Sequence, residues 1–114
     1  MKINEIVRLI KGTVLSGSES LENEVKIAFA SDLMSDVLTV KIDNLLLLTG
    51  LVNLQAIRTA EMSDINCIIF VRNKKVTEEM IRIARENKMI IIQSPYSMFK
   101  VSGILYNAGI KPVF

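Results

Sequence analysis

The chain has 114 residues, a length that fits one domain with one hydrophobic core, residues 1–114. Half of the residues are hydrophobic and the mean hydropathy is +0.37, so we expect an apolar surface patch that a second copy or a partner protein covers. The net charge is only +2, with interspersed signs and no tryptophan, which argues against a nucleic-acid-binding protein.

The chain contains no histidine. This excludes Ser-His-Asp and Cys-His catalysis and most zinc sites, and neither a GxxxxGK[ST] loop nor a GxGxxG turn occurs. The single cysteine, Cys67, lies in an apolar run and is interpreted as a buried hydrophobic residue in a reducing cytoplasm. Residues 1–11 lack the apolar segment of a signal peptide, and the leucines of residues 45–48 are far too few for a membrane span. We expect a cytoplasmic protein without metal, cofactor or membrane contact.

The amino-terminal quarter of the chain is irregular. A helix is expected to begin with a cap at Asn4 and to end at Gly12, and residues 13–15 predict a short strand followed by a polar loop. Residues 24–30 alternate between polar and apolar side chains, which predicts a strand with one buried face. The side chains expected on that face are Val25, Ile27 and Phe29.

Residues 31–38 carry two aspartates and two serines that allow two interpretations. Ser31 is placed as the N-cap of a helix, on which Asp32 and Asp36 would share a face, with Ser35 beside them. One interpretation is a solvated cap and a surface aspartate. The other is a polar cluster, which includes Ser31, Asp32 and Ser35, that faces a ligand or Mg²⁺.

The apolar run of residues 45–48 ends on Thr49 and Gly50 before a helix that we expect Asn53 to cap. The helix should lie on the sheet with Ala56, Ile57 and Ala60 inward. A buried strand that ends in Thr-Gly before a helix is a common way for an α/β domain to present a ligand at the carboxyl end of its sheet. Thr49, Gly50 and Asn53 are therefore candidate ligand-binding residues.

The next unbroken apolar strand, residues 67–71, runs directly into Arg72, Asn73 and Lys74, which are further candidates for binding an anion. Thr77 is expected to cap an amphipathic helix over residues 78–88, in which Glu78 and Arg82 form a favourable pair four residues apart.

Residues 89–92 predict another buried strand, and Ser97 is expected to cap a last helix over residues 98–108. This helix is apolar nearly all round, so it needs two surfaces to bury it. We expect a homodimer in which one side of the helix contacts a second copy. The interface residues proposed for that side are Met98, Phe99, Leu105 and Tyr106.

Unbroken apolar runs alternate with amphipathic helices in the second half of the chain. This pattern predicts a three-layer α/β/α sandwich with a largely parallel sheet and helices on both faces. The strands at residues 45–48, 67–71 and 89–92 should be adjacent and parallel.

Three segments, residues 30–38, 47–51 and 57–62, resemble the stand-alone DRTGG domain proteins of bacteria. The resemblance implies a three-layer α/β/α module, usually dimeric, that senses a ligand and does not catalyse a reaction. DRTGG domains also occur fused to phosphate acetyltransferases and beside CBS domains in regulated pyrophosphatases. Their fold is similar to the amino-terminal domains of HPr kinase and the Mur ligases.

The chain departs from the motif that gives this family its name. Residues 49–53, after the first strand concerned, contain no Asp-Arg pair, and residues 71–73, after the second, contain no Thr-Gly-Gly. The role of those motif residues cannot be carried over. What this chain shares with the family is the position of the two loops, which still follow the carboxyl ends of adjacent strands.

Three hypotheses follow for the function. The first is a non-catalytic regulatory module that binds a small anionic ligand, for example a nucleotide, at the strand ends. The second is an interaction or scaffold domain whose last helix binds a partner enzyme or kinase and which has no small-molecule ligand. The third, which we do not favour, is an enzyme that uses Asp32 and Asp36 with Mg²⁺.

Overall fold

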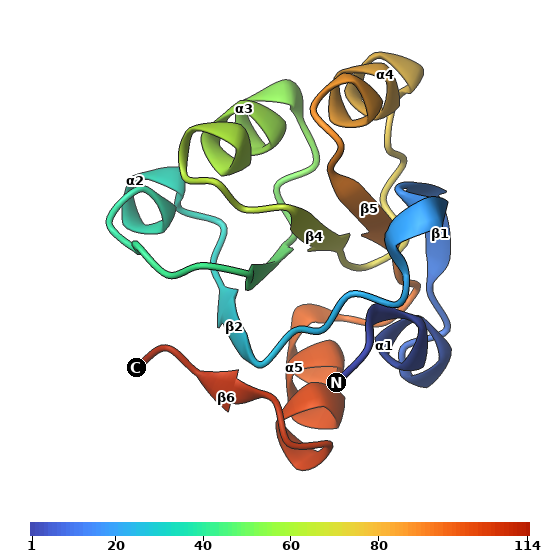
Figure 1. Ribbon diagram of the computed structural model, residues 1–114, viewed down its shortest axis with the longest axis vertical. Coiled ribbons are helices and arrows are strands. Elements are labelled where there is room, and N and C mark those ends of the chain that lie inside the picture. The colour runs from blue at the N-terminus through green and yellow to red at the C-terminus, as the bar shows by residue number, and fades with distance from the viewer.

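Short apolar runs form the centre of a six-stranded sheet in the computed structural model, which describes residues 1–114 (Figure 1). The strand order is β1-β5-β4-β3-β2-β6. The strands are β1 (Thr13–Ser16), β2 (Ile27–Ala30), β3 (Leu45–Thr49), β4 (Cys67–Phe70), β5 (Ile90–Gln93) and β6 (Lys111–Pro112). All neighbouring pairs are parallel except β1 and β5, which are antiparallel. The prediction that β3, β4 and β5 are adjacent and parallel is confirmed.

Helices cover both faces of the sheet and complete the predicted α/β/α sandwich. They are α1 (Ile3–Leu9), α2 (Met34–Val37), α3 (Leu54–Met62), α4 (Glu78–Glu86) and α5 (Met98–Asn107), and a 3₁₀ turn, η1, spans Ser18–Ser20. Figure 1 shows α2, α3 and α4 on one face of the sheet and α1 with α5 on the other. None of these helices is long and apolar enough to cross a membrane.

The unbroken leucine run of β3 is explained by burial on both faces. Leu45 and Leu47 belong to a core cluster of 17 buried residues beneath α2–α4, whereas Leu46 and Leu48 belong to a cluster of 14 beneath α1 and α5. Fully burying a leucine side chain contributes about 1.5–3 kcal/mol, so this strand is a major source of stability.

Three predicted helix caps are confirmed. The side chains of Asn53, Thr77 and Ser97 accept hydrogen bonds from the backbone N–H groups three residues later, which are those of Ala56, Met80 and Lys100. Each such cap contributes about 1 kcal/mol to helix stability. The ion pair predicted between Glu78 and Arg82 does not form. Arg82 pairs instead with Glu86, at 2.9 Å.

The amino-terminal segment differs from the prediction in two places. Helix α1 is capped by Lys2 instead of Asn4, and Lys11 takes the left-handed conformation expected of Gly12. A Cβ on Gly12 would lie 2.6 Å from Cγ2 of Ile92, so this glycine is required by close packing on β5.

The alternating segment does not have one continuous buried face. Val25 packs in the α1–α5 core, whereas Ile27 and Phe29 pack against the opposite core. The reason is that the backbone N–H of Val25 donates to the carbonyl of Met1 at 2.8 Å, so β2 begins only at Ile27.

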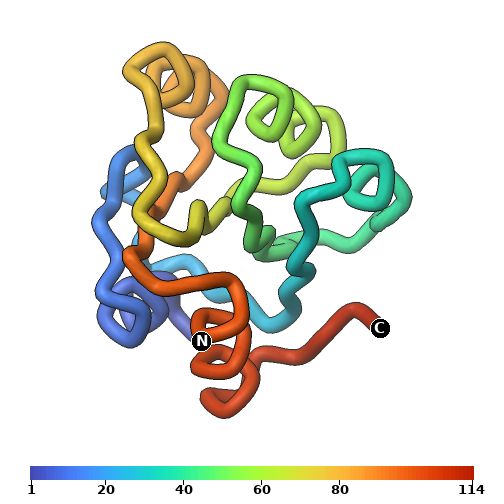
Figure 2. Tube along the Cα trace, turned by 180° about the vertical axis from the view of Figure 1, so that it is seen from behind, coloured from blue at the N-terminus to red at the C-terminus, as the bar shows by residue number.

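The sequence did not predict β6, an edge strand of two residues that pairs with Ile27 and Ala28. It lies beside β2 at the end of the chain, as Figure 2 shows from behind. Pro112 has no N–H to donate, which ends the ladder and suits an edge position.

Candidate functional site

Gly50, directly after β3, is held from two sides by residues of opposite charge. Oδ1 of Asp32 accepts hydrogen bonds from the Gly50 N–H at 2.6 Å and from the Thr49 hydroxyl at 3.0 Å. Nζ of Lys74 donates to the Gly50 carbonyl at 2.7 Å. Asp32 follows β2 and Lys74 comes from the loop after β4, so the ends of three neighbouring parallel strands meet here. We call Asp32, Thr49, Gly50 and Lys74 the strand-end cluster.

The two charges of the strand-end cluster are close but do not neutralise each other directly. A Cβ built on Gly50 would lie 3.4 Å from Oδ2 of Asp32 and 3.7 Å from Nζ of Lys74. The ion pairs within 4.0 Å join Lys2 to Glu22 and Arg82 to Glu86, and none joins Asp32 to Lys74. The carboxylate and the ammonium group can therefore each interact with a ligand.

The prediction that Ser31 caps a helix is wrong. Helix α2 begins at Met34 with Leu33 at its N-cap, and the Ser31 hydroxyl instead accepts a bond from the Leu33 N–H at 3.0 Å. Asp32 consequently precedes the helix, so it does not share a helical face with Asp36 as the prediction required. Ser35 is exposed on α2 and makes no side-chain hydrogen bond in the structure.

The loop after β4 leaves the side chains of Arg72 and Asn73 exposed but directs that of Lys74 toward Gly50. Arg72 and Asn73 have left-handed backbone conformations, and their N–H groups donate to the carbonyls of Tyr96 and Ser94 at 2.7 and 2.8 Å. Their side chains are exposed. Gln93 donates to the Lys74 carbonyl at 2.6 Å, which fixes the backbone from which the Lys74 side chain reaches Gly50.

These bonds close the crevice between β4 and β5. The connection after β4 leads to α4 on one face, and the connection after β5 leads to α5 on the other, so this is the switch point of the sheet. The loops bond to each other across it. The polar atoms that are open to a ligand therefore lie one strand further along, around Gly50.

Two further features describe the titratable groups of the chain. No three Cys, Asp or Glu side chains gather in a group that could hold a metal ion. Burial raises the pKa of the Cys67 thiol to about 12, so it stays protonated near neutral pH.

Asn53, a predicted ligand-binding residue, uses its side-chain oxygen to cap α3.

The predicted interface residues of α5 divide into two groups. Phe99 and Tyr106 are 90% and 66% exposed, as a contact with a second copy requires. Leu105 is only 2% exposed and Met98 packs partly against the same core, so the assignment of Leu105 to an interface is wrong. Leu105 follows Val101 by four residues and shares its inward face, a register that composition alone did not reveal.

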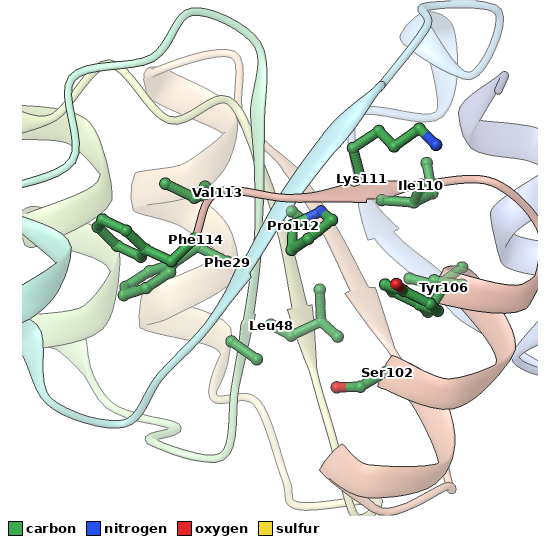
Figure 3. Close-up of a pocket in the computed structure, with 12 residues that line it drawn as sticks. Phe29, Leu48, Ser102, Tyr106, Ile110, Lys111, Pro112, Val113 and Phe114 are labelled. Atoms are coloured by element: carbon green, nitrogen blue, oxygen red, sulfur yellow. The ribbon is translucent and has the colours of Figure 1, made fainter.

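A second region that the sequence did not reveal is an apolar pocket of about 230 Å³ between β2, β6 and α5. We call it the edge pocket. In Figure 3 Leu48 and Ser102 lie at one end, and Tyr106 comes from α5. Phe29 meets Phe114 edge to face on the far side of β2. The pocket depends on β6, and the apolar residues Ile110 and Val113 on either side of that strand were the signal that could have indicated it.

Comparison with protein families matches residues 5–108 to the DRTGG domain. The chain therefore belongs to the DRTGG domain family. No curated protein matches the chain.

Among solved structures, the chain is similar to the CBS and DRTGG domains of the regulatory region of a pyrophosphatase from Clostridium perfringens, in complex with the activator diadenosine tetraphosphate. The TM-score is 0.76 at 15% sequence identity, and the match covers 98% of this chain and 48% of the other. The chain thus spans about half the length of that neighbour. At this identity the likeness establishes the fold.

Proposed function

We propose that this DRTGG domain is a non-catalytic regulatory module that binds a small anionic ligand, of the nucleotide class, at the carboxyl ends of β2, β3 and β4. The observation that carries the proposal is the strand-end cluster, in which Asp32 and Lys74 lie on either side of Gly50. Ligands of open α/β sheets bind at this edge of the sheet.

The cluster restricts how such a ligand can bind. A phosphate cannot take the Gly50 N–H while Asp32 accepts from it, and the carboxylate repels an anion placed beside it. The phosphate is therefore assigned to Lys74 and to the exposed side chain of Arg72. Oδ2 of Asp32 accepts no hydrogen bond from the protein and suits a ligand hydroxyl.

The structural neighbour supports a regulatory role for this fold, because its DRTGG domain belongs to the regulatory region of an enzyme whose activator is a dinucleotide. By analogy, the partner of this chain would be an enzyme whose activity the bound ligand adjusts. An interaction domain without a ligand is the alternative.

The test is a panel of nucleotides by thermal shift, followed by calorimetric titration of those that raise the melting temperature. Replacing Arg72 and Lys74 together by alanine should weaken binding by at least ~1–2 kcal/mol, the scale of a lost charge-assisted hydrogen bond. The matched control replaces Arg58 and Arg85, two exposed arginines on α3 and α4, and should leave affinity unchanged. If both double variants bind the nucleotide with equal affinity, Arg72 and Lys74 do not form its phosphate site.

We further propose that the module is a homodimer formed through the outward face of α5. Phe99 and Tyr106 are seven residues apart and so share one helical face, with Ser102 and Gly103 between them. Nothing lies within 4 Å of a Cβ built on Gly103, so a second helix can approach closely there. An antiparallel pair of α5 helices would place Phe99 of each copy near Tyr106 of the other.

Sedimentation equilibrium at tens of micromolar tests the dimer. Phe99→Glu should give a monomer, because it buries a charge in the contact. Met62→Glu is the control, since Met62 is 71% exposed on α3 and far from the proposed interface in sequence. A monomeric wild-type protein would refute the dimer, and a Phe99→Glu dimer would move the interface elsewhere.

A further inference from the structure

The edge of β2 presents backbone groups that no strand pairs. The Lys111 N–H donates to the carbonyl of Lys26 at 2.8 Å, and the Ser31 N–H donates to the carbonyl of Leu48 at 3.0 Å. Because consecutive residues of a parallel strand point their backbone groups to opposite sides, the N–H and C=O of Ala30 face away from β3. Ala30 lies opposite Leu48 of β3, but β6 pairs only with Ile27 and Ala28, so no strand residue lies opposite Ala30 on the outer side of β2.

The edge pocket lies beside these unpaired groups. Ala30 is one of its lining residues, and Leu48 and Leu105 give it an apolar wall. Tyr106, labelled in Figure 3, supplies an aromatic ring. Nine of its 12 lining residues are hydrophobic. A dry cavity of roughly 150 Å³ holds benzene, so a pocket of about 230 Å³ suits one planar ring system better than a long chain.

The edge pocket and the strand-end cluster are close along the chain. Ala30 lines the pocket and Asp32 is two residues later, which spans roughly 7 Å of extended backbone. Leu48 likewise lines the pocket two residues before Gly50. A ligand that filled the pocket and left it along β2 would reach the Asp32 carboxylate first and Lys74 beyond it.

We infer that the edge pocket is the base site of the nucleotide ligand, an inference that rests on the function proposed above. The base enters the pocket. There the N–H of Ala30 donates to an acceptor on the edge of the base, and the C=O of Ala30 accepts from a donor on the same edge. A purine such as adenine carries such a pair, its N7 acceptor and N6 amino group. The ribose hydroxyls then donate to Asp32, and the phosphate lies at Lys74.

The experiment compares a ligand that has a base with one that has none. AMP, GMP, CMP and UMP are titrated into the wild-type protein, and the tightest is compared with ribose 5-phosphate. A base that stacks on an aromatic side chain adds binding energy, so this nucleotide should bind at least about tenfold more tightly than ribose 5-phosphate.

Two variants fill the pocket from different elements. Ala30→Leu acts from β2 and Ser102→Leu from α5. Both are made in the Phe99→Glu background, because Ser102 also lies on the proposed dimer face, and each should remove the tenfold preference while leaving ribose 5-phosphate affinity unchanged. Ala108→Leu adds the same side chain at the exposed C-cap of α5, outside the pocket, and should keep the preference. Lys74→Ala should weaken the nucleotide and ribose 5-phosphate by a similar factor.

The outcomes separate this inference from the proposed function. If the nucleotide and ribose 5-phosphate bind equally to the wild-type protein, or if both filled variants keep the preference, the base site is overturned while the phosphate site stands. If no nucleotide of the panel binds, both are overturned. Thermal denaturation of each variant confirms that it is folded before it is titrated.

Discussion

The strand-end cluster and the edge pocket differ in how far the protein satisfies its own polar groups. Around Gly50, the N–H, the carbonyl and the neighbouring Thr49 hydroxyl all bond to side chains within the protein. At the edge, Ala30 has no partner on the β6 side, and three aromatic side chains nearby or on α5, Phe99, Tyr106 and Phe114, are largely exposed. The first region therefore holds the fold together and offers a ligand mainly charge, whereas the second contributes less to the fold and leaves surface for contact.

The largest effect expected from this comparison is the cost of Asp32→Ala. The Thr49 hydroxyl is fully buried and would lose its acceptor, and the Gly50 N–H would lose a charge-assisted bond. We expect the free energy of unfolding to fall by about 1–3 kcal/mol, measured by urea denaturation.

Asp36→Ala is the matched control for that experiment. Asp36 is exposed on α2 and its carboxylate makes no hydrogen bond or ion pair, so its loss should change stability by no more than ~0.5 kcal/mol. Equal stabilities of the two variants would show that the cluster does not hold the fold.

The comparison also explains what the sequence could predict. The inner strands and helices α3, α4 and α5 were predicted because their signals are local: unbroken apolar runs, a 3.6-residue period, and capping residues such as Asn53 and Thr77. Gly50 and Lys74 were named as site residues for the same reason, since each follows a strand that could be recognised by itself.

The features that were missed depend on contacts between distant residues. Asp32 was a predicted site residue, but its position was wrong. It bonds to residues 17 and 18 positions later, so it lies before the helix and not within it, and no local pattern shows this. Strand β6 has two residues and exists only because Lys111 reaches Lys26. The edge pocket depends on that pairing, and it was missed because the apolar residues Ile110 and Val113 do not show which strand they lie beside.

A smaller effect, of opposite sign, is expected on the exposed face of α5. Gly103 lies inside the helix with open space around its Cβ position, so Gly103→Ala should stabilise the monomer by about 0.5–1 kcal/mol. The measurement is made in a Phe99→Glu background, so that association through α5 does not contribute.

Gly109→Ala provides the contrast to Gly103→Ala. Its Cβ position is equally open, but its φ is +108°, a conformation that alanine rarely adopts. It should therefore destabilise the protein. If both substitutions stabilised the protein, the turn that leads from α5 into β6 would not need its left-handed residue, and the edge would be less constrained than the structure indicates.

The smallest effect concerns Phe114, whose ring meets Phe29 edge to face at a centroid distance of 6.0 Å while 91% of the residue remains exposed. A buried aromatic pair contributes about 0.5–1.5 kcal/mol, and an exposed pair should give the lower end of that range. Phe114→Ala in the Phe99→Glu background should therefore cost about 0.5 kcal/mol by urea denaturation. Met62→Ala, which removes an exposed side chain without a ring partner, should cost less. A loss of several kcal/mol on removing Phe114 would mean that Phe114 belongs to the hydrophobic core. The edge pocket would then contribute to stability as the strand-end cluster does, and the contrast between the two regions would fail.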